Sequence, residues 1–205
     1  AQPSNRGNIG LIGDLRYGFN YVWSDKFLRL LFATLLLFLI FGMPYMHLLP
    51  VFQGILEVGP ELLGFMYGAM GLGGFFGSLT VASFRRFSNR TPQLIFGALF
   101  SLSLMGFALS PLYFLSLLLL FFSGYFHTAY TTINQTLILT RSDPSVHGRV
   151  ISMNMMLRSS ITIVVLPMGF LVDQFGGPST LAASGTVLLF CFAGILLFTR
   201  KNSED

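Results

Sequence analysis

Charged residues are scarce in this sequence. Only 10% of its 205 residues are Asp, Glu, Lys or Arg, whereas a soluble domain has about 25%. At the same time 53% of the residues are hydrophobic, and a soluble core of this length could not hide so much apolar surface. The shortage of charge therefore excludes an ordinary soluble protein and predicts an integral membrane protein.

Cysteine is almost absent as well. Cys191 is the only one; it lies inside an apolar run and has no partner within the chain, so we expect it to be a small apolar filler. Residues 1–27 lack the short apolar core of a signal peptide. The chain also starts at Ala1 rather than Met, which we interpret as a fragment or a processed piece.

Enzyme motifs are missing too. His47, His127 and His147 do not have the spacing of metal ligands, and the sequence has no P-loop. The glycines of residues 71–74 lie in an apolar run and not after a strand, which argues against a dinucleotide-binding turn. We therefore expect no enzyme activity, no metal site and no cofactor.

What the sequence does contain is six apolar runs, each close to the roughly 20 residues that a membrane helix needs. They cover residues 28–50, 61–84, 92–110, 112–139, 150–172 and 180–199. We predict an all-α integral membrane protein with a six-helix transmembrane bundle over residues 28–199. Residues 1–27 are expected to be a cytoplasmic lead-in with an interfacial helix, and residues 200–205 a cytoplasmic tail.

The basic residues predict the orientation of these runs. Eleven of the twelve Lys and Arg residues lie before or at the start of the first run, between the second and third, between the fourth and fifth, or after the sixth. The other three connectors have none. The positive-inside rule places the basic connectors and both termini in the cytoplasm. The pI of 9.5 is therefore a signal of topology, and no nucleic-acid partner is expected.

The twelfth basic residue, Arg158, is predicted to lie inside the membrane. It follows Arg149 by nine residues on the same run, which is about 13 Å of helical rise. Asn154 and Thr162 lie four residues to either side, so the three share one helix face. We interpret this polar stripe as part of an anionic-substrate or coupling site. The alternative is structural, with Arg158 snorkelling toward headgroups and its neighbours bonding other helices.

The fourth run carries a second polar group. His127, Thr131 and Asn134 are predicted to share a helix face, with Gln135 beside them. An imidazole can carry a proton near neutral pH, and it can also be a neutral hydrogen-bonding group between helices. No Asp or Glu lies deep in any of the six runs, so we do not expect a coupling carboxylate in this chain.

Two further patterns predict helix packing. In the second run, Gly64 and Gly68 are four residues apart, and so are Gly73 and Gly77, a spacing that lets two helices approach closely. The third and sixth runs carry hardly any polar residues. We expect these two helices to face lipid on the outside of the bundle.

Three stretches resemble a known family. GMPYMHLLPVF, GPELLGFMYGAMGLGGFFGS and SDPSVHGRVISMNMMLR are similar to the C-terminal half of a twelve-helix major facilitator superfamily transporter. The nearest branch is the drug-antiporter-3-like exporters that include the enterobactin exporter. The most specific piece is the D-P-x-x-x-G-R-V turn that begins at Asp143 and ends at Val150. Arg158 also falls where members of this branch carry an arginine.

The resemblance implies a cytoplasmic gate. In such a gate Arg141, Asp143 and Arg149 would break and re-form contacts during alternating access. Arg85 and Arg86 stand where a loop signature of the superfamily places arginines, but the acidic residue of that signature is missing from this sequence.

The resemblance also implies a function: secondary active transport, with proton-coupled efflux of drugs, siderophores or similar amphipathic compounds across a bacterial inner membrane. The substrate would bind between two six-helix halves, in a pocket with aromatic walls that include Tyr45 and Tyr67. The partners would be membrane lipid and an N-terminal half in the same polypeptide, or a second copy in a homodimer. An uptake permease of the same fold and a non-transporting assembly subunit are the alternatives.

Overall fold

The computed structural model describes residues 11–83 and 89–201, and the side chains of residues 18–83 and 89–199. This part of the chain is helical and contains no strand. The helices are α1 (Leu11–Ser24), α2 (Lys26–Phe41), α3 (Tyr45–Ile55), α4 (Pro60–Ser83), α5 (Thr91–Ala108), α6 (Tyr113–Arg141), the short 3-10 helix η1 (Pro144–Val146), α7 (His147–Ser159), α8 (Ile161–Phe175) and α9 (Gly177–Lys201).

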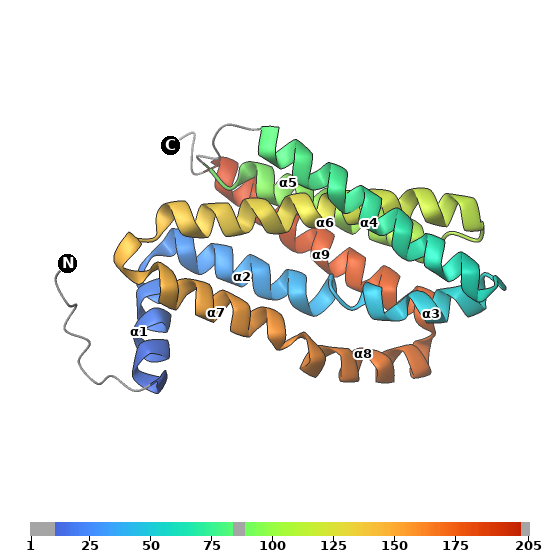
Figure 1. Cartoon of the computed structure of the whole chain (residues 1–205), viewed down its shortest axis with the longest axis horizontal. Helices are drawn as coiled ribbons and strands as arrows, with labels where there is room; N and C mark the ends of the chain where they lie inside the picture. Colours follow the sequence, from blue (N-terminus) through green and yellow to red (C-terminus); the bar gives the residue numbers. More distant parts are fainter. Residues whose placement is uncertain (1–10, 84–88, 202–205) are drawn as a thin grey trace.

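Six segments of this structure are long and apolar enough to cross a membrane. They are Lys26–Ile55, Pro60–Ser83, Thr91–Ala108, Tyr113–Arg141, Pro144–Phe175 and Gly177–Thr199. The predicted all-α membrane fold is therefore confirmed. The segments run back and forth along one long axis, while α1 crosses that axis at one end (Figure 1).

The first span is interrupted near its middle. The amides of Gly42 and Met43 both donate to the Phe38 carbonyl, and Pro44, which has no N–H, precedes α3. The helix then resumes and continues through Pro50 to Ile55, five residues beyond the predicted end. Beyond it, Glu57 has a positive φ of 52°, so the chain turns there before α4 begins at Pro60.

The fifth span is also interrupted, although the sequence predicted one continuous helix. It comprises η1, α7 and α8, and the break falls at Ser160. The Ser159 and Ser160 hydroxyls donate to the carbonyls of Met155 and Met156, in competition with the backbone ladder. Thr162 lies beyond the break and is exposed. The predicted stripe of Asn154, Arg158 and Thr162 therefore does not lie on one continuous helix.

Close backbone contact joins α4 to α6. A Cβ added to Gly73 would fall on the Phe121 carbonyl, one on Gly77 on the Tyr125 carbonyl, and one on Gly124 on the Met70 carbonyl. The predicted role of Gly73 and Gly77 in packing is confirmed. Gly64 and Gly68 are different, because an added Cβ at either position would meet nothing within 4 Å.

The third span is more buried than its expected position facing lipid suggests. Nine of the 18 residues of α5 are buried, including Gln93, Phe100, Leu104 and Phe107. The ring of Phe100 packs against Phe38, with 4.8 Å between the centroids. The other side of α5, with Ile95, Leu99 and Leu102, is exposed, so this helix packs against the core with one face and leaves the opposite face open to lipid.

The buried core is divided in two along the bundle. One cluster is built around Phe38, Phe52, Phe100 and Phe107, and a second contains Leu28, Leu31, Ile133 and Leu137. The second cluster lies toward the end where α2 begins and α6 ends.

Candidate functional site

A small cavity opens between α6 and α7. Its volume is about 140 Å³, and it is lined by Gln135, Ile138, Leu139, Ile151, Asn154, Met155 and Arg158. Three of the predicted site residues, Gln135, Asn154 and Arg158, are thus brought together by the structure. Because Asn154 and Arg158 are four residues apart on α7, both side chains reach the same face.

Two hydrogen-bond donors on side chains that line this cavity have no acceptor among the described residues. The Arg158 Nε–H donates to Asn154 Oδ1 over 2.8 Å, which fixes the planes of both groups. Arg158 Nη2 and Asn154 Nδ2 are buried and have no hydrogen-bond partner among the described residues. Buried polar groups are normally satisfied, so two unpaired donors at one place indicate a position for an oxygen acceptor. A carboxylate, phenolate or phosphate oxygen has this chemistry.

His127 lies deeper, in an aromatic cage. Its ring is 5.3 Å from that of Phe38, 5.9 Å from that of Phe100 and 6.2 Å from that of Tyr45. Its Nδ1 atom is buried without a hydrogen-bond partner among the described residues. His127 does not line the cavity that holds Arg158.

The other predicted residues of α6 point elsewhere. Asn134 is fully buried, and its Nδ2–H donates to the Leu31 carbonyl of α2 over 3.2 Å. Thr131 donates back to the carbonyls of His127 and Thr128 within its own helix. Neither side chain lines the cavity that holds Arg158. In this structure Asn134 joins two helices, which is the structural alternative that the sequence left open for such residues.

The two tyrosines expected in the pocket walls are also outside this cavity. Tyr45 is 1% exposed and belongs to the aromatic core around His127. Tyr67 is partly exposed on α4, and its hydroxyl donates to the Met46 carbonyl of α3 over 3.2 Å. It therefore connects two consecutive helices.

Sequence reasoning missed a buried polar group formed by α2, α5 and α6. Thr34, Gln93 and Tyr130 come from three different helices and lie close together; the Gln93 amide donates to Thr34 Oγ1 over 3.2 Å. Gln93 Oε1 and the Tyr130 hydroxyl have no partner of good geometry among the described residues. Gln93 was the available signal, since it is the one amide side chain in an otherwise apolar run.

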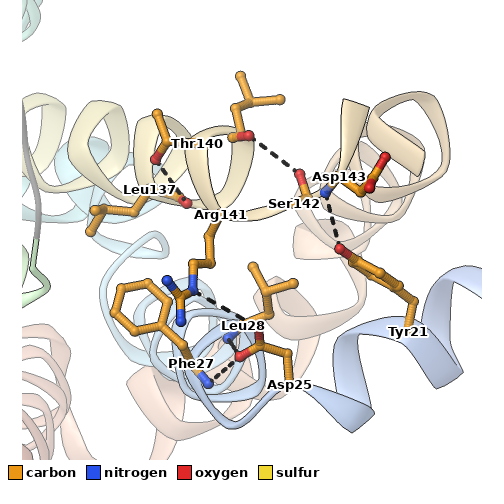
Figure 2. Close-up of polar contacts among 10 residues, drawn as sticks. Tyr21, Asp25, Phe27, Leu28, Leu137, Thr140, Arg141, Ser142 and Asp143 are labelled. Atoms are coloured by element: carbon orange, nitrogen blue, oxygen red, sulfur yellow. Dashed lines mark hydrogen bonds and ion pairs between the residues drawn. The ribbon is translucent and has the colours of Figure 1, made fainter. Parts of the chain in front are cut away.

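A second polar cluster lies at the end of the bundle where α6 meets the fifth span (Figure 2). Arg141 Nε is 3.9 Å from Asp25 Oδ2, and the guanidinium lies 5.3 Å from the centroid of the Phe27 ring. Asp25 also caps α2 by accepting from the amides of Phe27 and Leu28. Both charged side chains are substantially exposed, at 60% and 37%, so the ion pair itself is weak.

Asp143 does not pair with Arg141 in this structure. Its carboxylate accepts from the Ser145 amide at the start of η1, and its backbone N–H donates to the Tyr21 hydroxyl over 3.0 Å (Figure 2). Hydrogen bonds from the Ser145 side chain and backbone hold the pKa of Asp143 below its usual value. Tyr21 and Asp25, which the sequence reading did not select, are thus the direct partners of this turn.

Of the remaining predicted gate residues, the structure describes Arg149 but not Arg85 and Arg86. Arg149 lies where α1 packs on α7: its Cβ is 3.6 Å from the position that a Cβ on Gly18 would occupy. Arg85 and Arg86 lie outside the described residues. The gate therefore remains a prediction, and its described members surround the junction of α1, α6 and η1.

Six membrane-length segments and a polar cavity between two of them are typical of a membrane transporter. Comparison with known families agrees. The chain matches the family of transmembrane secretion effectors, a major facilitator family, over residues 1–205. The chain belongs to this family, and the match supports a membrane transporter. No curated protein and no solved structure shows a significant match.

Proposed function

We propose that this chain is part of a secondary active exporter that moves small amphipathic molecules with an anionic group. The observation that carries the proposal is the pair of unpaired donors, Arg158 Nη2 and Asn154 Nδ2, at one cavity inside a membrane span. A charged side chain inside the membrane costs free energy, so an arginine that is kept there indicates a function. A scaffold subunit has no need of such a residue, which favours transport over assembly.

The size of the cavity limits what it can hold. About 140 Å³ accommodates a functional group and a few waters but not a whole drug-sized molecule, which needs about 300 Å³ or more. We infer that the anionic group of the substrate binds at Arg158 and that its apolar body lies outside this cavity. A second six-helix half would cover that body, because major facilitator transporters bind substrate between two related six-helix halves.

Alternating access then needs contacts that hold in one state and break in another. The weak Asp25–Arg141 pair and the Tyr21–Asp143 hydrogen bond are suited to this role because neither is buried. We propose that they form part of the cytoplasmic gate, together with the predicted residue Arg149. The placement of this end on the cytoplasmic side rests on the positive-inside rule, and the bacterial inner membrane rests on the sequence resemblance.

We also propose that transport is coupled to protons through His127. No described carboxylate lies near the cavity, so His127 is the titratable candidate within this half. Its buried Nδ1 atom has no hydrogen-bond partner among the described residues, which supports a role for this imidazole in binding a proton. Export, and not uptake, and the relation to the enterobactin-exporter-like branch rest on the sequence resemblance.

The test is transport by variants of Arg158 in the full-length protein. Cells that express Arg158→Ala should export a fluorescent amphipathic carboxylate at least about tenfold more slowly than wild type, since an interaction with a charged partner is lost. Arg158→Lys keeps the charge but not the planar donor pair and should retain intermediate export. Ser152→Ala is the matched control, because Ser152 is exposed on the same helix and does not line the cavity. Normal export by a correctly inserted Arg158→Ala protein would contradict the proposal.

A further inference from the structure

A larger cavity lies on the other side of the bundle, at the end where α2 begins and α9 ends. Its volume is about 720 Å³, and it is lined by Lys26, Arg29, Leu30, Ala33, Arg90, Gly194, Ile195, Phe198 and Thr199. It is formed by the first two turns of α2, the residue before α5 and the last turns of α9. It shares no residue with the cavity at Arg158.

Three of the lining side chains are basic and none is acidic. The nearest carboxylate in sequence, Asp25, is already engaged: it accepts from two amides of α2 and pairs with Arg141. Within the part of the chain that the structure describes, no carboxylate pairs with Lys26, Arg29 or Arg90. The cavity therefore has an excess of positive charge that nothing in the described structure neutralises.

The arginines are partly held in place. The Arg90 guanidinium lies 5.2 Å from the centroid of the Phe27 ring, and Arg29 Nη1 donates to the Trp23 carbonyl over 3.5 Å. Partial burial lowers the pKa of Arg90, so a negative group beside it is favourable. Each guanidinium has five N–H donors, and these contacts leave most of them available.

The cavity changes character with depth. Lys26, Arg29 and Ala33 are spaced three and four residues apart, so they share one face of α2, and Ala33 lies about 10 Å deeper than Lys26. Leu30, Ala33, Ile195 and Phe198 make the deeper wall apolar. Basic groups at the membrane surface above an apolar groove match the two halves of a phospholipid with a negative headgroup.

We propose that this cavity binds an anionic phospholipid, with its phosphate at Lys26, Arg29 and Arg90 and an acyl chain along Leu30, Ala33, Ile195 and Phe198. The lipid would join the start of α2, the start of α5 and the end of α9 from the leaflet at this end of the bundle. The proposal requires the membrane-embedded fold but does not depend on the direction or substrate of transport.

The test uses the full-length protein, purified in a neutral detergent and mixed with equal amounts of phosphatidylglycerol and phosphatidylcholine. Native mass spectrometry counts the lipids that remain bound. The wild-type protein should retain phosphatidylglycerol in preference to phosphatidylcholine. Each charge removed should weaken retention about fivefold, and the triple variant Lys26→Gln, Arg29→Gln, Arg90→Gln should lose it roughly a hundredfold.

Two matched controls separate this site from general surface charge. Arg141→Gln removes a basic side chain at the same end of the bundle that does not line the cavity, and it should retain the lipid. Gly194→Leu keeps all charges but fills the apolar part, where an added Cβ meets nothing within 4 Å, and it should lose the lipid. Gly64→Leu places the same side chain on α4, where an added Cβ also meets nothing within 4 Å, and this variant should keep the lipid.

The contradicting results are equally definite. Equal retention of both lipids by wild type, or equal losses in the triple variant and Arg141→Gln, would overturn the site. Displacement of phosphatidylglycerol by millimolar inorganic phosphate, with Gly194→Leu unchanged, would show that the cavity binds a free anion and not a lipid.

Discussion

The helix α5 and the fifth span have opposite relations to the core, although both are apolar. Their most apolar segments have mean hydropathies of 1.4 and 1.8, so the fifth span is the more hydrophobic. Yet nine residues of α5 are buried, whereas α7 and α8 together bury only Val150, Asn154 and Met168. In a membrane, hydropathy identifies a span but does not show whether it packs against protein or lipid.

This difference matters for the site. The polar residues of α5 and α6, such as Gln93 and Asn134, are enclosed by other helices and mainly make contacts within the bundle. Those of α7 lie along the edge of the bundle, where the fifth span is held by few core contacts (Figure 1). A side chain such as Arg158 can therefore meet a substrate or a second half of a transporter, whereas Gln93 can not.

The largest effect is expected where backbones touch. Gly124→Leu on α6 would drive a side chain into the Met70 carbonyl of α4 and should destabilise the fold by about 3 kcal/mol or more, since the backbone has no room to move. Gly64→Leu, the same change where no atom lies within 4 Å, should change stability by less than about 0.5 kcal/mol. Thermal unfolding in detergent measures both; equal effects would show that the α4–α6 contact is not close-packed.

The difference in burial between α5 and the fifth span can be tested by replacing one Phe with Ala in each. Phe100→Ala on α5 removes a fully buried ring and should destabilise by about 2–3 kcal/mol. This is below the usual loss in soluble cores because the unfolded chain remains in lipid. Phe170→Ala on α8 removes a ring that is 62% exposed.

The outcome for Phe170 distinguishes two environments. If its face meets only lipid, the change should affect stability by less than about 0.5 kcal/mol. A loss as large as that of Phe100→Ala in the full-length protein would break the comparison, because it would show that another segment covers this face. Thermal unfolding in detergent measures the change in stability for both variants.

The sequence predicted the number of membrane spans and their helical class because length and hydropathy are local properties. It predicted the close approach at Gly73 and Gly77 but also gave Gly64 and Gly68 the same role, since spacing does not say which face meets a neighbour. The breaks at Gly42 and Ser160 followed from side-chain and backbone hydrogen bonds that periodicity does not register.

Only those contacts of the candidate site that are local in the sequence could be predicted. Asn154 and Arg158 lie one turn apart on a helix, so their contact could be read from the sequence. Gln93 and Thr34 are 59 residues apart and meet only in the folded bundle. Asp25 had a local signal, because an aspartate directly before an apolar run is a helix N-cap, but its pairing with Arg141 depends on tertiary structure.

A smaller effect is expected at the junction that holds the start of the fifth span. Asp25→Ala removes the cap of α2 together with the exposed pair to Arg141 and should destabilise by about 1 kcal/mol. Asp25→Asn keeps a capping side chain and loses only the charge, so its effect should be within about 0.5 kcal/mol. Thermal unfolding of the two variants separates cap from ion pair; equal losses would assign the whole effect to the charge.

The most direct test of the central claim is water access to the cavity between α6 and α7. Gln135 lines that cavity, and Cys191 is the only native cysteine in the chain, so Gln135→Cys can be labelled in a Cys191→Ser background. A membrane-impermeant maleimide should label it faster than Phe170→Cys, and the amphipathic carboxylate used for export should slow the labelling. A rate no higher than that of Phe170→Cys, or one that the carboxylate leaves unchanged, would contradict a transport pathway at Arg158.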